Sequence, residues 1–335
     1  MRSKTIASAA SIALLVGLAA CGDDSGDAGS STEGGGGEAA SDYPSEEMDW
    51  TIAFGPGGGN DIMARTMVDI INQYELYPEN IRLENREGGS GATGWGYLLN
   101  QAGSGYGIST TSGSFITTPL QADTGWTYED FTPVGLFATD DAIFVVPGDS
   151  ELETWEDWVE YATAQESVVV GGIGTVNVDF ILHQLLADAA GYEIEYVSFN
   201  EEGQLQTALF SGALDAIVSN TGSILGQIEA EEVRPLLFTG PERLDVIPDV
   251  PTGEELGITD LPALPRGMIL PPDAPQEAQD FWIETMKEVV ETPEWAEYIE
   301  SNYLAENILW GEDLNVYLGE VVEDFTTILT EAGAL

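Results

Sequence analysis

The sequence predicts an α/β protein of two lobes, and two patterns indicate this. Short β-rich runs alternate with segments whose apolar residues recur at helical spacing, such as Met63, Met67 and Ile70. This alternation is typical of parallel sheets with helices on both faces. In addition, two segments more than a hundred residues apart share one design, in which a strand runs through a glycine-rich loop into a helix. The simplest account is two lobes that each begin with this unit.

The expected elements follow in order along the chain. Short runs rich in β-branched and aromatic residues predict strands at 50–54, 81–84, 107–111, 168–170, 195–198, 216–219 and 234–238. Helical periodicity predicts helices at 60–73, 91–101, 178–190, 204–210, 223–230, 274–290, 294–301 and 314–330. The chain is 43% apolar and contains eight Trp, which is ample material for a core.

The two similar segments offer the same chemistry. Residues 51–54 run into 55–61, Gly-Pro-Gly-Gly-Gly-Asn-Asp, and residues 168–170 run into 171–177, Gly-Gly-Ile-Gly-Thr-Val-Asn. A helix N-terminus exposes unpaired N–H groups and the positive end of the helix dipole. Glycine lets an anion approach those groups closely. Either loop alone could be a tight connection, but two facing loops would hold both ends of a dicarboxylate.

The first 20 residues predict an export signal. Arg2 and Lys4 precede an apolar run over residues 6–20, which is too short for a membrane-spanning helix. The run ends Leu-Ala-Ala before Cys21, the only cysteine, and resembles a lipoprotein signal in which Cys21 is acylated. The alternative is an ordinary cleaved signal beside a stray cysteine. Acylation would leave no thiol for a disulfide, a metal or catalysis.

Residues 21–47 are expected to form a disordered acidic Gly/Ser linker, because they have no apolar period and contain four consecutive glycines at 34–37. The fold is then expected to start near Met48. Lobe one is expected over 48–142 together with 249–335, and lobe two over 143–248.

Charge sets the class of partner. The chain has 59 Asp+Glu against 9 Lys+Arg, and cleavage before Cys21 would leave seven cations and a net charge of about −52. These acids are spread along the chain. We interpret them as adaptation to a saline medium, where the Debye length falls to roughly 3 Å at 1 M. The alternative is a merely acidic extracellular protein. Nucleic acid is excluded, since binding it requires clustered Lys and Arg.

Several catalytic and cofactor signatures are incomplete. Residues 55–61 lack the Gly-Lys-Ser/Thr ending of a P-loop. Residues 89–94 match G-x-G-x-x-G, but Ser109 stands where a dinucleotide-binding fold has Asp or Glu. The only histidine, His183, falls inside an expected helix, where a structural role is favoured over a general base. No G-x-S-x-G occurs, and one His with one Cys cannot form a zinc site. We therefore expect no enzyme, cofactor or metal.

Residues 54–65 contain the motif Phe54-x-x-Gly57-Gly58-Gly59-Asn60-Asp61-x-x-Ala64-Arg65. Further distinctive blocks follow at 84–91, 130–134, 211–216, 234–236 and 247–252. In this motif and in the order of these blocks, the sequence resembles the receptors of tripartite tricarboxylate transporters, the TctC or Bug proteins. The resemblance implies a type II periplasmic-binding-protein fold, in which two α/β lobes joined by crossing strands close on a ligand.

The resemblance also implies which residues bind the ligand. From lobe one these are Phe54, Gly58, Gly59, Asn60, Asp61, Ser90 and Gly91, with Thr110 and Ser112 as possible hydroxyl donors. From lobe two they are Gly174, Thr175, Val176, Asn177, Phe199 and Asn200. For Asp61, capping of the loop and an ion pair with Arg65 are favoured over ligand contact. Asp215 is favoured as a turn residue, and Arg86 as a residue that orders the loop at 88–91.

The second loop departs from the family pattern Gly-x-Gly-Ser-x-x-His. Here the second glycine, the serine and the histidine are replaced by Val176, Asn177 and Phe180. This leaves the identity of the ligand open.

The sequence therefore predicts a lipid-anchored extracytoplasmic receptor that acts as a monomer and binds a small di- or tricarboxylate. Its other partners would be membrane permease subunits. With so few cations, the site is expected to use backbone dipoles and hydroxyls without help from Lys or Arg. Two alternatives remain open: a secreted hydrolase that uses paired carboxylates, and a receptor for a neutral or aromatic solute.

Overall fold

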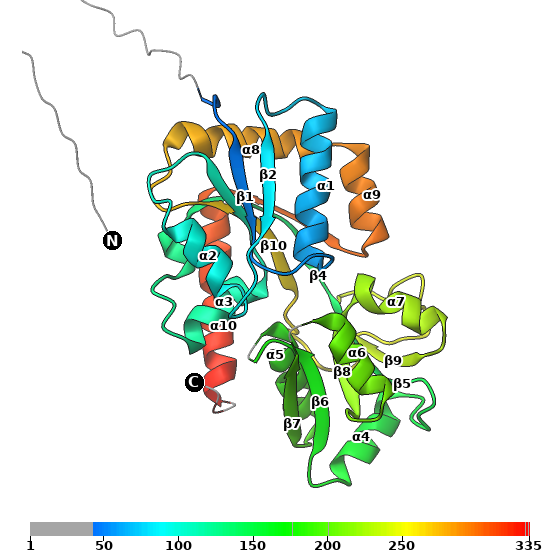
Figure 1. The fold of residues 1–335 in the computed structure, drawn as a ribbon. Helices are drawn as coiled ribbons and strands as arrows, with labels where there is room; N and C mark the ends of the chain where they lie inside the picture. Colours follow the sequence, from blue (N-terminus) through cyan, green and yellow to red (C-terminus); the bar gives the residue numbers. More distant parts are fainter. Residues whose placement is uncertain (1–42, 176, 200, 332, 334) are drawn as a thin grey trace, which may run out of the picture. The chain divides into compact units, whose positions relative to one another are not determined.

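The computed structural model describes residues 43–335 except 176, 200, 332 and 334, and contains two sheets (Figure 1). The six-stranded sheet has the order β11-β4-β10-β3-β1-β2. Its strands are β1 (Met48–Ile52), β2 (Ile81–Asn85), β3 (Gly107–Thr110), β4 (Thr132–Asp140), β10 (Leu264–Leu270) and β11 (Ala305–Trp310). The five-stranded sheet has the order β7-β6-β8-β5-β9. Its strands are β5 (Ala142–Pro147), β6 (Val168–Ile173), β7 (Ile194–Phe199), β8 (Ala216–Asn220) and β9 (Val233–Phe238).

Each sheet and its helices form one lobe, which confirms the predicted two-lobe α/β class. Lobe one contains α1 (Gly59–Gln73), α2 (Ala92–Leu99), α3 (Gly113–Gln121), α8 (Gln276–Val290), α9 (Pro293–Ser301) and α10 (Glu312–Glu331). Lobe two contains α4 (Trp155–Thr163), α5 (Val178–Ala190), α6 (Glu202–Phe210) and α7 (Thr221–Glu229). Short 3-10 helices occupy Tyr128–Asp130 and Glu254–Leu256. Within the described part of the chain, no helix is both long and apolar enough to cross a membrane.

Both sheets are mixed, whereas the alternation of strands and helices alone predicted parallel sheets. Strand β10 is antiparallel to β3 and β4, and β11 is antiparallel to β4. In lobe two, β5 is antiparallel to β8 and β9. The reason is that the chain leaves lobe one through β4 and returns through β10, so these strands run in opposite directions and need no crossover helix.

The first sheet packs apolar side chains against helices on both faces. Met268 and Leu270 of β10 belong to the core cluster that also contains Trp282 of α8 and Trp295 of α9, whereas Ile269 belongs to the opposite cluster. This alternation follows from the two-residue period of a strand. Helices α1 and α9 contact each other, and Figure 1 shows them side by side.

The folded body includes residues that precede the predicted start at Met48. Tyr43 lies against Tyr106 and Phe281, with ring centroids 5.1 and 5.4 Å apart. The Tyr43 hydroxyl donates to the Gly105 carbonyl at 2.8 Å and accepts from the Trp282 indole N–H at 3.0 Å. Residues 43–47, which were expected to belong to the linker, are thus held to the folded body, and the Tyr77 hydroxyl also donates to the Glu46 carbonyl at 2.8 Å and the Asn80 amide to Glu47 at 2.7 Å.

We predict that Tyr43→Phe lowers the free energy of unfolding by about 1–3 kcal/mol, because the buried Gly105 carbonyl and Trp282 N–H lose their partner. Urea unfolding at constant salt measures this. Tyr74→Phe is the matched control, since the Tyr74 hydroxyl contacts Glu294 at the surface and Tyr74 is 43% exposed. Equal losses in both variants would contradict the anchoring role of Tyr43.

Candidate functional site: the helix N-termini between the lobes

The first glycine loop, residues 55–58, connects β1 to α1. Gly57 has a φ of 84°, in the left-handed region that favours glycine. Gly58 precedes the helix with an extended backbone, and no side chain caps the helix there. The first N–H groups of α1 lack partners within the helix, and they carry the positive end of its dipole. The first loop thus has the backbone expected of an anion site.

Two of the predicted ligand residues, Asn60 and Thr110, are bonded to each other. The Asn60 side chain is buried, donates to the Thr111 carbonyl at 3.1 Å and accepts from the Thr110 hydroxyl. These bonds fix the start of α1 against the end of β3. Both side chains therefore position the loop, because their polar atoms are already used.

The Asp61 carboxylate is fully engaged. It accepts from the Gly57 N–H at 2.9 Å and from the Asn85 amide at 2.9 Å, and it pairs with Arg65 at 2.8 Å. Burial opposes ionisation of Asp61, but these hydrogen bonds and the Arg65 charge together lower its pKa. The structure thus has the favoured capping and ion-pair arrangement at Asp61.

Two further expectations concern Asp215 and Arg86. The Asp215 carboxylate accepts from the Val169 N–H at 2.7 Å and from the Tyr161 hydroxyl at 3.0 Å, so it holds the start of β6. The Arg86 guanidinium pairs with Glu84 at 2.7 Å and lies 3.6 Å from the centre of the Tyr97 ring. These contacts hold Arg86 on the surface of β2 and α2. The expected role of Arg86, to order the loop at 88–91, has no counterpart in these contacts.

The second glycine loop connects β6 to α5. Gly174 has a φ of 77°. Its N–H donates to the Phe199 carbonyl at 2.9 Å, and its carbonyl accepts from the Tyr196 hydroxyl at 3.1 Å. Thr175 is exposed, whereas Asn177 precedes α5 and is 7% exposed. The predicted residues Val176 and Asn200, like Cys21, lie outside the described residues.

The second loop approaches lobe one at two points. A Cβ built on Gly174 would lie 3.4 Å from the Ser90 hydroxyl oxygen. A Cβ built on Gly113, the first residue of α3, would lie 3.3 Å from Asn177 Oδ1 and 2.6 Å from a Val178 methyl. The N-termini of α3 and α5 therefore meet, next to the loop that carries Ser90 and Gly91.

The two glycine loops were expected to face each other, and Gly57 and Gly58 of the first loop make no close contact with the second loop. A Cβ on Gly57 would meet nothing within 4 Å, and one on Gly58 would meet only the Gly55 carbonyl. The second loop faces α3 instead. From the sequence, Ser112 was expected at the end of a strand and α3 was not predicted, because Pro119 and two threonines weaken the helical pattern of α3.

The residues that precede α3 and α5 have free polar groups. Neither Ser112 nor Asn177 caps its own helix. Among the described residues, the Ser112 hydroxyl and Asn177 Oδ1 have no hydrogen-bond partner although both atoms are buried. A buried polar atom without a partner is costly, so these two atoms mark the place where a ligand would be accommodated.

The two aromatic rings of the predicted site pack within their own lobes. The Phe54 ring contacts Trp95 edge to face, with centroids 5.7 Å apart. The Phe199 ring lies beside Gly171, 3.3 Å from the position of a Cβ there. Both residues help to shape the loops next to them.

A buried cation lies behind the first loop. The guanidinium of Arg266 on β10 contacts Gly59 and pairs with Asp140 at the end of β4. Arg266 is 6% exposed. The pKa of Asp140 is raised, because the effect of burial exceeds the lowering by the Arg266 charge and by the hydrogen bonds from Arg266 and Asn220. Sequence reasoning missed Arg266 because about 200 residues separate it from Gly59 and no local motif marks it.

Lobe two contributes a buried carboxyl group at Asp179 and a half-buried one at Glu202, and neither forms an ion pair with a cation in the part of the chain that the structure describes. Asp179 accepts from the Ile173 N–H at 2.7 Å, and Glu202 accepts from Ser219 and from Gln206. Burial, with the nearby charges of Glu202 and Asp140, raises the pKa of Asp179 to about 7. The described residues contain no group of His, Cys, Asp and Glu suited to a metal ion.

His183 is a buried histidine inside α5. Its Nε2 lies 3.1 Å from the Gly171 carbonyl oxygen, and burial lowers its pKa to about 4. The neutral ring therefore packs in the core of lobe two beside Phe144, which agrees with the structural role favoured from the sequence.

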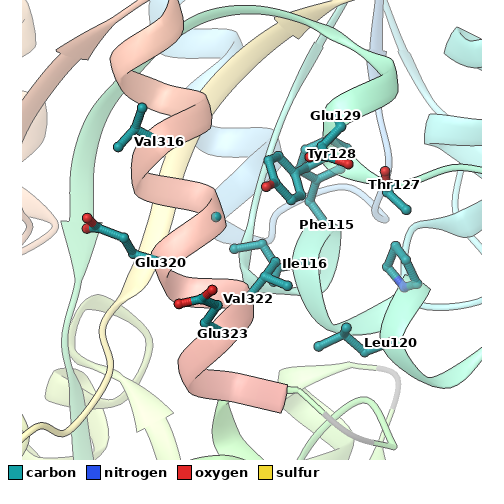
Figure 2. Close-up of a pocket in the computed structure, with 12 residues that line it drawn as sticks. Phe115, Ile116, Leu120, Thr127, Tyr128, Glu129, Val316, Glu320, Val322 and Glu323 are labelled. Atoms are coloured by element: carbon teal, nitrogen blue, oxygen red, sulfur yellow. The ribbon is translucent and has the colours of Figure 1, made fainter. Parts of the chain in front are cut away.

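A separate groove of about 510 Å³ lies between α3, the 3-10 helix at Tyr128–Asp130 and α10 (Figure 2). Phe115, Ile116 and Leu120 form its apolar wall, and Glu320 and Glu323 lie along α10. None of the predicted ligand residues lines it. Its apolar wall and acidic rim do not suit an anion.

Two α/β lobes with helix N-termini meeting between them define a two-lobe solute-binding protein. Residues 66–333 match the family of tripartite tricarboxylate transporter receptors, TctC, and the chain belongs to this family. A relative from Agrobacterium vitis, the UPF0065 protein in the TAR-I ttuE-ttuC' intergenic region, is 27% identical over 265 residues, which cover 76% of this chain and 75% of the relative.

Solved structures share the fold. The periplasmic binding protein BugD superposes with a TM-score of 0.78 at 20% identity, covering 87% of this chain and 99% of BugD. MatC from Rhodopseudomonas palustris, solved with bound malate, superposes with a TM-score of 0.74 at 17% identity, covering 86% of this chain and all of MatC. These comparisons place the fold among the periplasmic binding proteins.

The contrast between Asp179 and Asp61 generates a pH prediction. A folded-state pKa of about 7, above the ordinary 3.8, means that stability falls as pH rises from about 4 to about 7. Asp179→Asn removes this loss, because an amide oxygen can still accept from Ile173. The free energy of unfolding of Asp179→Asn relative to the native protein should therefore be higher at about pH 8 than at about pH 5 in urea titrations.

Asp61→Asn is the matched control, since both carboxylates accept from an N–H of the preceding loop. Its lowered folded-state pKa keeps Asp61 ionised at both pH values, so this variant should lose similar stability at each. A relative stability of Asp179→Asn that does not change with pH would contradict the assignment.

Proposed function

We propose that this protein is the extracytoplasmic receptor of a tripartite tricarboxylate-type transporter and binds a small di- or tricarboxylate between its lobes. The observation that carries the proposal is the meeting of the α3 and α5 N-termini, where Ser112 and Asn177 have buried polar atoms without partners. In this proposal Cys21 carries a lipid anchor and a membrane permease receives the ligand. The receptor binds and releases its ligand without covalent chemistry.

The geometry favours an anionic ligand. Backbone N–H groups at the start of α1, α3 and α5 are unpaired within their helices, and the aligned peptide dipoles favour negative charge. Ser90 and Ser112 add hydroxyl donors at the same place. That MatC was solved with malate supports the same class of ligand.

The hydrolase alternative receives no support from the candidate carboxylates. Asp61 and Asp215 would be its first candidates, but each uses its oxygens for hydrogen bonds within its own lobe. A general acid or base must reach the reacting group, so these carboxylates are poorly placed for that work.

A thermal-shift screen of the protein in high salt tests the proposal with malate, succinate, adipate and citrate. A ligand present at a hundred times its dissociation constant should stabilise the protein by about 2.7 kcal/mol. Uncharged and aromatic solutes of similar size serve as controls. Stabilisation by these controls alone would replace the proposal with the neutral-solute alternative.

The negative charge of the chain predicts an unusual salt dependence of association. Because an anion approaches a protein with 59 acidic residues, its association rate should increase as salt screens the repulsion. Stopped-flow measurements over a salt range in which the protein stays folded test this. Rates that decrease with salt would show that attraction at the site outweighs the field of the whole surface.

A further inference from the structure

The Arg266 guanidinium covers the start of α1. A Cβ built on Gly59 would lie 2.6 and 2.8 Å from its two terminal nitrogens and 3.0 Å from its central carbon, so the terminal nitrogens of the guanidinium point at Gly59. The Cα–Cβ bonds of a helix tilt toward its N-terminus. The guanidinium is therefore at the end of α1 where the unpaired N–H groups are exposed.

This contact brings two positive groups together. The helix N-terminus carries a partial positive charge, and Arg266 carries a full one. The Asp140 carboxylate accepts a hydrogen bond from Nη2 of Arg266. Nε of Arg266 has no hydrogen-bond partner among the described residues. The Arg266 side chain is only 8% exposed, so the unpaired donor is costly. An anion bound at the exposed N–H groups of α1 would lie beside this guanidinium and interact with both positive groups.

The backbone around Arg266 is built to hold this position. The pairing of β10 with β4 shifts its register between Arg266 and Gly267, and such irregularities redirect a side chain. Gly267 is bonded on both sides to Thr111, whose N–H donates to the Gly267 carbonyl at 2.8 Å and whose hydroxyl accepts from the Gly267 N–H at 3.1 Å. Because Thr111 immediately precedes Ser112 and α3, Arg266 is fixed beside the proposed ligand site.

We propose that Arg266 is the charged anchor for one carboxylate of the ligand, together with the first N–H groups of α1, and that Asp140 is the internal counter-ion with which this carboxylate competes. The inference rests on the proposed function and narrows it, since a neutral solute would leave the anchor unsatisfied. Gly59 is then required as glycine because the guanidinium occupies the space of a side chain.

Two variants separate this role from a purely structural one. Arg266→Gln should weaken binding of the best carboxylate in the panel by roughly 10- to 100-fold, the loss expected for a charged hydrogen-bonded contact. Asp140→Asn should tighten binding, because it removes the competing carboxylate. Both variants disturb a buried ion pair and should lower the stability of the free protein. Isothermal titration calorimetry in high salt measures the affinities.

Arg234→Gln is the matched control, because Arg234 donates to backbone carbonyls of residues 148, 150 and 152 in lobe two. Its affinity should equal that of the native protein. Weakened binding in both Arg266→Gln and Asp140→Asn, or unchanged binding in both, would overturn the anchor while leaving the proposed function in place. Native protein that binds none of the carboxylates would overturn both.

A second pair of variants keeps the inference testable if Arg266→Gln fails to fold. Arg266→Lys keeps the charge but loses the planar guanidinium, and Gly59→Ala displaces the guanidinium from α1. Each should weaken carboxylate binding, whereas Gly58→Ala should not, because a Cβ on Gly58 meets only the Gly55 carbonyl, at 3.9 Å. Native affinity in both Arg266→Lys and Gly59→Ala would overturn the inference.

Discussion

The scarcity of positive charge constrains how this protein can present a site for an anion. Of the seven Lys and Arg residues after residue 42, six pair with carboxylates and only Arg266 is buried. Helix N-termini supply positive potential without a formal charge. Salt screens the exposed acids far more than it screens a buried group. A site made of helix ends and one buried guanidinium therefore keeps its field in a protein that is otherwise strongly negative.

The two glycine loops share one hydrogen-bond arrangement but differ in the charge of the aspartate that forms it. In each, an aspartate in the first turn of the helix accepts from an N–H of the loop, and this bond fixes the turn. Asp61 is paired with Arg65 and stays ionised, whereas Asp179 lacks a cation and is kept partly protonated near neutral pH by burial and neighbouring acids. The second loop is thus fixed by the same kind of bond, but it carries less negative charge at the start of α5. A fully ionised Asp179 there would repel an anionic ligand.

The sequence predicted the repeated strand-loop-helix units well, because each is a local pattern. The helix at 178–190 was predicted with its exact bounds and the helix at 60–73 within one residue, since both follow glycine loops and carry clear periodicity. The strands β4, β5, β10 and β11 were missed, because they cross or flank the lobes without the helix that would complete a βαβ pattern. For the site, the residue types were predictable from the loops, but their partners were not: Gly174 faces Ser90, and Arg266 faces Gly59, only because the tertiary fold joins distant segments.

The position of Asp140 links the site to the connection between the lobes. Asp140 ends β4, one residue before the chain enters lobe two, and accepts both from Arg266 and from the Asn220 amide at 2.5 Å. The connection is further tied where Ala142 and Thr239 exchange hydrogen bonds of 2.8 and 2.9 Å. A group that draws Arg266 away from Asp140 leaves that carboxylate to Asn220 of lobe two alone. Because burial already disfavours the charged form of Asp140, the loss of its cation shifts the balance of contacts at the point where the lobes join. In the proposed arrangement, ligand binding at the first loop and the contacts at the connection between the lobes involve the same buried pair.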